Sequence, residues 1–141
     1  MQQLPITLTL KLGTTEVNYP VQSTDASGFF TVSVNSLSGT YNWRVKGPKY
    51  LANAGQVVLS GAPVTQTEMG LMKTGDCNDD NVINALDFTV VKNTFGKTIG
   101  DPGYDARADF DGDNTITSVD FILQRGNFGT TGAPPLSPSV R

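Results

Sequence analysis

Oxygen-bearing side chains recur at one regular spacing in the second half of this 141-residue chain. A loop of about twelve residues that binds a hard divalent cation takes ligands from positions 1, 3, 5, 7, 9 and 12, with a backbone carbonyl at position 7. Two segments place an oxygen at each of these positions. The first offers Asp76, Asn78, Asp80, the carbonyl of Val82, Asn84 and Asp87. The second offers Asp109, Asp111, Asp113, the carbonyl of Thr115, Thr117 and Asp120.

These donors predict two calcium sites. Calcium is favoured over magnesium because the loops offer many flexible oxygen ligands, and over zinc because the chain has no His and a single Cys. The second loop has four carboxylates where the first has three, so we expect it to bind more tightly. Position 6, which must turn sharply, is Asn81 in one loop and Asn114 in the other, and Asn tolerates left-handed geometry well.

Each loop runs into a helical pattern, LDFTVVKNTFG after the first and VDFILQRGNFG after the second. A single loop-helix unit buries little, so we expect the two units to pack face to face around apolar side chains. Ile83 and Ile116, at position 8 of the loops, are predicted to pair across them as a short apolar bridge.

The first half of the chain alternates apolar and polar residues, which indicates half-buried strands. The pattern predicts strands at 4–12, 18–24, 28–34, 39–47, 56–60 and 64–72, separated by turn compositions. The fold class is therefore mixed: an antiparallel β-sandwich over residues 1–73, a small α-helical calcium-binding domain over 74–130, and a Pro- and Ser-rich tail over 131–141. The short connection LMKTG predicts a fixed interface between the two domains.

Catalysis is not expected. The absence of His removes the commonest general base, and nothing local brings two carboxylates of the sandwich together for glycoside hydrolysis. Those carboxylates belong to Glu16, Asp25 and Glu68. Four aromatic residues of the sandwich are expected mainly in its core, with a sugar-stacking platform as the lesser alternative. They are Phe29, Phe30, Tyr41 and Trp43.

Charge excludes further partners. Residues 76–141 carry ten Asp against five Lys and Arg, for a net charge of −5, which would repel nucleic acid and anionic membrane surfaces. No apolar run approaches the ~20 residues that span a bilayer, and MQQLPITLTL lacks the features of a secretion signal. We expect neither nucleic-acid binding nor membrane insertion.

The segment from Gly75 to Gly129 resembles a dockerin, the duplicated F-hand calcium module, because both loops carry Asp at position 12 where the EF-hand has Glu. The resemblance implies that the loop residues named above are calcium ligands, those at positions 9 and 12 partly through water. It also implies a non-catalytic module for protein assembly, an extracellular or cell-surface location on a bacterial protein, and a cohesin-like partner.

Dockerins bind cohesins through their helix faces, and loop positions 10 and 11 are often Ser-Thr in the cellulosomal type. Here these positions are Ala85-Leu86 and Ser118-Val119, and the basic positions further along are Lys92 and Arg125. The departure leaves three roles open for the apolar pairs: binding a different cohesin, docking on the adjacent sandwich, or packing in the core.

The stretch from Val17 to Leu51 resembles prealbumin-like and carboxypeptidase-regulatory-like modules, through its order of turn, aromatic strand, turn and aromatic strand. Cys77, at position 2 of the first loop, is expected to be a semi-buried apolar side chain, the alternative being a reactive thiol or an intermolecular disulfide.

Two functions follow from these patterns. The first is an attachment module of a larger secreted protein. The alternative is a protomer of an extracellular filament or surface layer that binds copies of itself: LPITLTLKL would complete a neighbour's sheet, and the tail would lie along another subunit. The tail composition is also typical of a flexible linker or a stalk that carries O-linked glycan.

Overall fold

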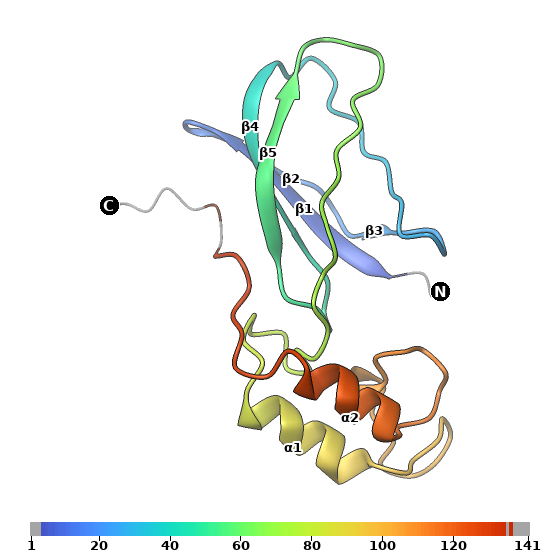
Figure 1. Cartoon of the computed structure of the whole chain (residues 1–141). Helices are drawn as coiled ribbons and strands as arrows, with labels where there is room; N and C mark the ends of the chain where they lie inside the picture. The colour runs from blue at the N-terminus through green and yellow to red at the C-terminus, as the bar shows by residue number, and fades with distance from the viewer. Residues whose placement is uncertain (1–3, 135, 137–141) are drawn as a thin grey trace.

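The computed structural model describes residues 4–134 and 136. An antiparallel sheet forms the first half of the chain, and two helices lie beneath the end of the sheet where β4 finishes and β5 begins (Figure 1). The elements are β1 (Pro5–Leu12), β2 (Thr15–Asn18), β3 (Gln22–Ser23), β4 (Gly39–Lys46), β5 (Asn53–Leu59), α1 (Ala85–Thr94), the 3-10 helix η1 (Ala106–Ala108) and α2 (Ser118–Arg125).

The strands form one sheet in the order β2-β1-β4-β5, with β3 paired to β1 as well. The predicted strand 18–24 is divided between β2 and β3, and Pro20, which has no backbone N–H to give to a ladder, lies between them. β1 is central: it pairs with β4 on one side and with β2 and β3 on the other. The segment LPITLTLKL is therefore no free edge, and the predicted strand addition through it is wrong. The outermost strand on the opposite side is β5.

Alternate side chains of β1 and β4 form the core of the sheet, as the period of two predicted. This buried cluster comprises Ile6, Leu8, Leu10, Tyr41, Trp43, Val45 and Leu59. The prediction that most sandwich aromatics are core residues is confirmed, because Tyr41 and Trp43 are buried and Phe30 packs against the cluster. Phe29 is the exception, with 73% of its surface exposed.

Two predicted strands do not form. Residues 28–34 and 64–72 adopt no strand, and the described residues contain one sheet of five strands where a sandwich of six or seven was expected. In residues 28–34, the alternate side chains Phe30, Val32 and Val34 pack partly buried against the core, as the period of two predicted. In residues 64–72, Met69 and Met72 pack against the core, but they are not alternate positions, and Val64 and Leu71 expose 74% and 89% of their surface. Neither segment pairs with a strand.

The helical module has its own core. Phe88 of α1 and Phe121 of α2 contact each other with ring centroids 5.7 Å apart. A buried cluster of Cys77, Val91, Ala108, Phe110 and Ile116 fills the space between the loops and the helices. The packing of two loop-helix units around apolar side chains is thus confirmed. No helix among the described residues is long and apolar enough to span a membrane.

The predicted fixed interface between the two modules is confirmed by backbone hydrogen bonds. The amide of Leu51 donates to the carbonyl of Lys73 at 2.8 Å, and the amide of Gly75 donates to the carbonyl of Lys49 at 3.0 Å. The side-chain amide of Asn127, after α2, donates to the carbonyl of Thr74 at 2.9 Å. The connection LMKTG therefore lies against the turn between β4 and β5.

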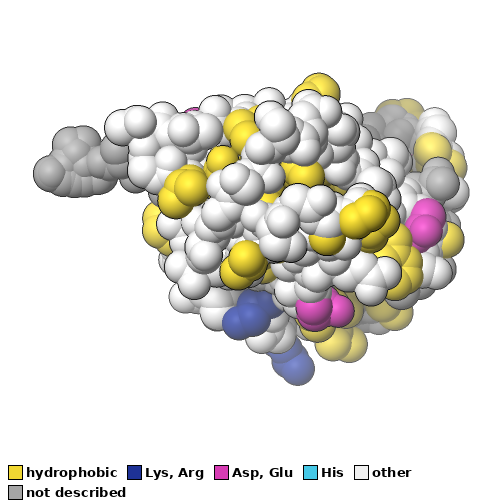
Figure 2. Space-filling model, turned by 90° about the horizontal axis from the view of Figure 1, so that it is seen from above, with side chains coloured by type: hydrophobic (Ala, Val, Ile, Leu, Met, Phe, Trp, Pro, Cys, Tyr) yellow, Lys and Arg dark blue, Asp and Glu magenta, His cyan; other side chains and the backbone are white. Residues whose placement is uncertain are grey.

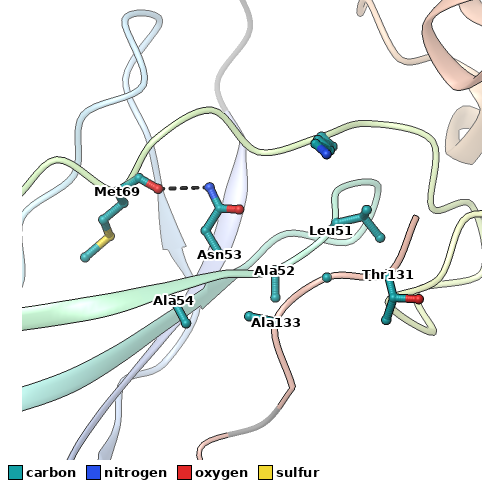
Figure 3. A pocket seen from close by; sticks show the side chains of 9 residues that line it. Leu51, Ala52, Asn53, Ala54, Met69, Thr131 and Ala133 are labelled. Atoms are coloured by element: carbon teal, nitrogen blue, oxygen red, sulfur yellow. Dashed lines mark hydrogen bonds between the residues drawn. The ribbon is translucent and has the colours of Figure 1, made fainter. Parts of the chain in front are cut away.

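The start of the predicted tail belongs to this interface. The amide of Gly132 donates to the carbonyl of Asn81 and that of Ala133 to the carbonyl of Ala52, each at 2.9 Å. Figure 3 shows Thr131 and Ala133 beside Leu51 and Ala52, where they line a shallow hollow at the start of β5. Residues 135 and 137–141 of the predicted tail, and with them most of the predicted glycan stalk, lie outside the described residues.

Candidate metal centre

The first loop brings its carboxylates together. Asp76, Asp80 and Asp87 each present an oxygen within 4.8 Å of the others. Asp76 and Asp87 are fully buried, and backbone hydrogen bonds of the loop itself offset the cost of burying their carboxylates. Asp76 accepts from the amides of Asp80 at 3.1 Å and Asn81 at 2.8 Å. Asp87 accepts from the amide of Asn78 at 3.1 Å and that of Asn84 at 2.9 Å.

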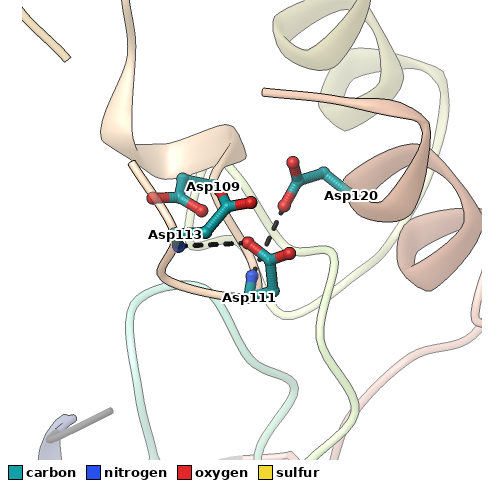
Figure 4. A group of neighbouring side chains, drawn as sticks. All are labelled: Asp109, Asp111, Asp113 and Asp120. Atoms are coloured by element: carbon teal, nitrogen blue, oxygen red, sulfur yellow. Dashed lines mark hydrogen bonds between the residues drawn. The ribbon is translucent and has the colours of Figure 1, made fainter. Parts of the chain in front are cut away.

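In the second loop, four carboxylates each present an oxygen within 4.8 Å of the others (Figure 4). Three of them come from the loop and the fourth from the first turn of α2; they are Asp109, Asp111, Asp113 and Asp120. Asp109 accepts from the amide of Asn114 at 2.9 Å, as Asp76 does from Asn81 in the first loop. The two loops therefore repeat the same local structure.

Positions 9 and 12 of each loop also cap the following helix. Asn84 is the N-cap of α1 and forms a reciprocal capping box with Asp87; Thr117 does the same for α2 with Asp120. The helix start and the acidic site are consequently specified by the same residues. Asp87 and Asp120 accept backbone N–H groups of the loop with part of their lone pairs, which leaves the other lone pairs for a cation.

Position 6 has the predicted backbone geometry. Asn81 and Asn114 both have φ of 68°, in the left-handed region that Asn tolerates. Ile83 and Ile116, which were predicted to pair with each other, each form backbone hydrogen bonds with a different segment. The carbonyl of Ile83 accepts from the amide of Gly129, and the carbonyl of Ile116 accepts from that of Gly96, each at 2.8 Å. Each isoleucine is thus paired with the chain that follows the other unit's helix.

The remaining predicted ligands lie within the loops. Asn78 bonds to Asp80 through its side-chain nitrogen at 3.2 Å. The amides of Val82 and Thr115, whose carbonyls were predicted to bind metal, donate to the position-5 carboxylates Asp80 and Asp113 at 3.0 Å and 2.9 Å. Asn84 and Thr117 direct a side-chain oxygen to the amide two residues later, as N-caps do.

Desolvation raises the pKa of one carboxylate in each loop. Burial raises the pKa of Asp76, and a hydrogen bond from Lys46 opposes the rise. Desolvation raises the pKa of Asp111 to about 6, and the neighbouring Asp109 and Asp120 add to that rise. Several oxygen donors with depleted hydration, held close together, match the demand of a hard cation such as Ca²⁺. The donor sets of both loops therefore fit calcium.

Contacts from the sheet to the loops were missed by the sequence analysis. Lys46 donates to Gly47 and to two carboxylates of the first loop, and Lys49 donates to the backbone carbonyl of Asp109 at 2.7 Å. Asn81, predicted only as a turn residue, bonds to Ala52 and Ala133. The two lysines of the segment KGPK are the signal for these contacts, but no spacing rule connects them to loops about 30 and about 60 residues later.

All residues predicted to contact a protein partner are exposed. They are Ala85, Leu86, Lys92, Ser118, Val119 and Arg125. Of the roles left open for the apolar pairs, packing in the core is excluded for Leu86 and Val119, which expose 63% and 49% of their surface. Neither side chain belongs to the clusters that hold the sheet or the helical module together.

Cys77 is a core residue of the helical module, more deeply buried than the expected semi-buried position. It exposes 1% of its surface, and burial, followed by the charge of Asp87, raises the pKa of its thiol to about 12. The thiol is therefore protonated at neutral pH and enclosed by protein, which argues against the reactive-thiol and intermolecular-disulfide alternatives.

Comparison with known proteins agrees with this geometry. A family model described as "Dockerin type I domain" matches residues 74–124. Two solved structures are similar to the chain: an N-terminal and a C-terminal interface mutant of a type II cohesin–X-dockerin complex from Acetivibrio cellulolyticus. Both have a TM-score of 0.64, at 22% and 20% identity, and both matches cover 90% of this chain and 83% of the other.

At 22% and 20% identity, the similarity to the two complexes shows a shared fold and nothing more. No curated protein matches the chain. The family match covers about a third of the chain, and together with the loop geometry it supports a dockerin type I domain over residues 74–124, with acidic clusters compatible with calcium.

Proposed function

We propose that the chain is a non-catalytic, calcium-stabilised assembly module that attaches a larger extracellular protein to a cohesin-like domain. One observation carries the proposal: two acidic loops of the same local structure each start a helix whose first turn exposes an apolar side chain. Dockerin modules belong to secreted or surface-bound cellulosome components, which supports an extracellular location. Millimolar calcium outside the cell would fill even weak loops.

The proposed binding surface consists of the outward faces of α1 and α2. Leu86 and Val119 occupy position 11 of their loops and are related by the internal repeat. Ile122 and Leu123 extend the apolar surface of α2, with 56% and 37% of their area exposed. The predicted contacts Lys92 and Arg125 lie near the ends of the two helices and would give the surface a positively charged margin. An apolar centre with a charged margin is the usual composition of a protein interface.

The end of the sheet far from the helices is a less suitable binding surface. Seen from that end, hydrophobic side chains lie in several separate places among backbone and other side chains (Figure 2). The likeness of the sheet to prealbumin-like and carboxypeptidase-regulatory-like modules stays a prediction. We assign the sheet the role of a support that fixes the orientation of the helical module, because the two share backbone hydrogen bonds.

Titration calorimetry against purified type I and type II cohesin domains tests the proposal. We expect one of them to bind in calcium and not in chelator. The double variant Leu86→Asp/Val119→Asp should weaken binding at least tenfold, since it places two charges in a desolvated contact. Val58→Asp, on the exposed face of β5, is the matched control and should bind as the unaltered chain does. If Leu86→Asp/Val119→Asp binds cohesin as tightly as Val58→Asp does, the outward faces of α1 and α2 are not the binding surface.

Strand addition in the filament alternative would have to use an edge of the sheet, β5 on one side or β2 and β3 on the other, because β1 is paired on both sides. Light scattering at high protein concentration, with and without calcium, separates the two functions. A monodisperse monomer supports the attachment module, whereas long particles would support self-assembly.

A further inference from the structure

The end of β4 delivers an ammonium group to the first acidic loop. Lys46 Nζ lies 3.0 Å from Oδ2 of Asp76 and also forms an ion pair with Asp79. The Asp76 side chain is fully buried, and that of Lys46 exposes 11% of its surface. The position-1 carboxylate of the first loop is therefore shared between the loop's own amides and a cation from the sheet.

The second loop has no such cation. Tyr104 donates its hydroxyl to the Asp109 carboxylate at 3.2 Å, which adds a hydrogen bond and no charge. Lys49 reaches the same residue, but its Nζ donates to the backbone carbonyl. Among the described residues, no Lys or Arg nitrogen lies within 4.0 Å of a carboxylate of the second loop. Two lysines of one turn thus contact position 1 of both loops in chemically different ways.

We propose that Lys46 sets the calcium affinity of the first loop, by neutralising part of its carboxylate charge when the loop is empty and opposing the ion when it binds. The inference rests on the proposed calcium binding and concerns a residue outside the dockerin domain. The Lys46 contact is a second reason, besides the smaller number of carboxylates, to expect a lower calcium affinity in the first loop than in the second.

The direction of the effect follows from charge. In the empty loop, Asp76, Asp80 and Asp87 repel one another at short range, and the ammonium group of Lys46 relieves that repulsion. A dication bound to the same oxygens would itself neutralise the carboxylates. The ammonium group of Lys46 would then relieve no repulsion and would instead repel the ion. Like charges a few ångströms apart in a partly buried site interact strongly enough to change an affinity by about tenfold or more.

The coupling is reciprocal by thermodynamic necessity. If Lys46 weakens calcium binding to the first loop, calcium in that loop weakens the Lys46–Asp76 contact by the same factor. The Lys46–Asp76 contact is consequently tightest when the first loop is empty. This gives the module an order of filling, with the second loop first.

A calcium titration of the full chain followed by NMR tests the proposal, because each loop has its own reporter. The amides of Asn81 and Asn114 both donate to a position-1 carboxylate, at 2.8 Å and 2.9 Å. In Lys46→Met we expect the affinity read at Asn81 to rise about tenfold, with that at Asn114 unchanged. Lys46→Gln is a second neutral variant and should behave likewise, and Lys46→Arg should stay within about twofold of the unaltered chain.

Lys49→Met is the matched control, since Lys49 contacts a carbonyl, and it should not raise the affinity read at Asn114. Melting supplies a second readout: Lys46→Met should lower the melting temperature in chelator more than in saturating calcium. The role of Lys46 would be overturned if the calcium affinity read at Asn81 is unchanged or lower in both Lys46→Met and Lys46→Gln while both loops still bind calcium. The proposed calcium binding would stand in that case. Failure of the unaltered chain to bind calcium would overturn the proposed function together with this inference.

Discussion

The side-chain oxygen of Asn81 accepts a hydrogen bond from the backbone N–H of Ala52 at 2.8 Å, so the first acidic loop is bonded directly to the residue before β5. The nitrogen of the same side chain donates to the carbonyl of Ala133 at 2.9 Å, and Arg44 Nε donates to that carbonyl at 3.0 Å. One amide thus joins the loop, the start of β5 and the segment after α2. The helical module cannot reorient without breaking these bonds.

Gly132→Ala should loosen this junction. A Cβ at this position would lie 2.2 Å from Oδ1 of Asn81 and 2.6 Å from the nitrogen of Ala52, so both partners must move. We expect a loss of about 1–3 kcal/mol in the free energy of unfolding, measured with denaturant, as for other overpacked sites. Gly126→Ala is the control, because its Cβ would meet only ordinary contacts at 3.5 Å and its backbone is helical. Equal stability of the two variants would show that the junction is not rigid.

Asp109→Ala should cost more calcium affinity than Asp76→Ala. The second loop holds four carboxylates against three, and the first already shares Asp76 with Lys46. Titration calorimetry of both variants against the unaltered chain gives the two losses. A larger loss from Asp76→Ala would reverse the ranking of the loops.

Removal of calcium should unfold residues 75–130 before the sheet. An ion that binds only the folded state stabilises it by about 2.7 kcal/mol per site at a hundredfold excess over the dissociation constant. Trp43 is the only Trp and is buried in the sheet, so its fluorescence reports the sheet alone. On heating in chelator, we expect the helical circular dichroism to be lost at a lower temperature than the Trp43 emission. Unchanged dichroism and melting in chelator would contradict calcium as a folding ligand.

Acidification should act in opposite directions with and without calcium. The pKa of Asp111 in the metal-free fold is about 6, above the ordinary value of about 3.9 for an unfolded chain. The folded state therefore holds a proton that the unfolded chain has released, and metal-free stability is lost as pH rises from about 4 to about 6. Calcium needs the ionised carboxylate, so its affinity should fall as pH drops below about 6. Melting curves at neutral and mildly acidic pH, with Asp111→Asn as the control lacking this titration, measure both trends.

Gly55→Ala should destabilise the sheet. Its Cβ would lie 2.6 Å from Cζ2 of the buried Trp43, which is paired with Gly55 across β4 and β5. Overpacking of this kind costs about 1–3 kcal/mol in the free energy of unfolding, measurable by denaturant with Trp43 fluorescence as the signal. Val58→Ala, on the exposed face of the same strand, controls for a general effect on β5. Similar stability of both variants would mean that the indole ring shifts without cost.

The sequence by itself determined the features that depend on local spacing. The alternation of apolar residues identified β1 and β4 and the side chains that form their core. The order of oxygen-bearing residues identified both loops, and the same residues start the helices as caps, so that site and secondary structure were specified together. Such features involve residues close in the chain, whose geometry follows from backbone periodicity.

Only the tertiary structure decided how distant segments meet. The period of two in residues 28–34 showed which side chains face the core, but strand pairing depends on the backbone of a distant segment, and residues 28–34 and 64–72 form no strand. The same holds for Lys46, whose ammonium reaches Asp76 because the turn after β4 lies against the first loop. A long flexible side chain has no preferred partner in sequence, so its role was fixed by the packing of the sheet onto the helical module.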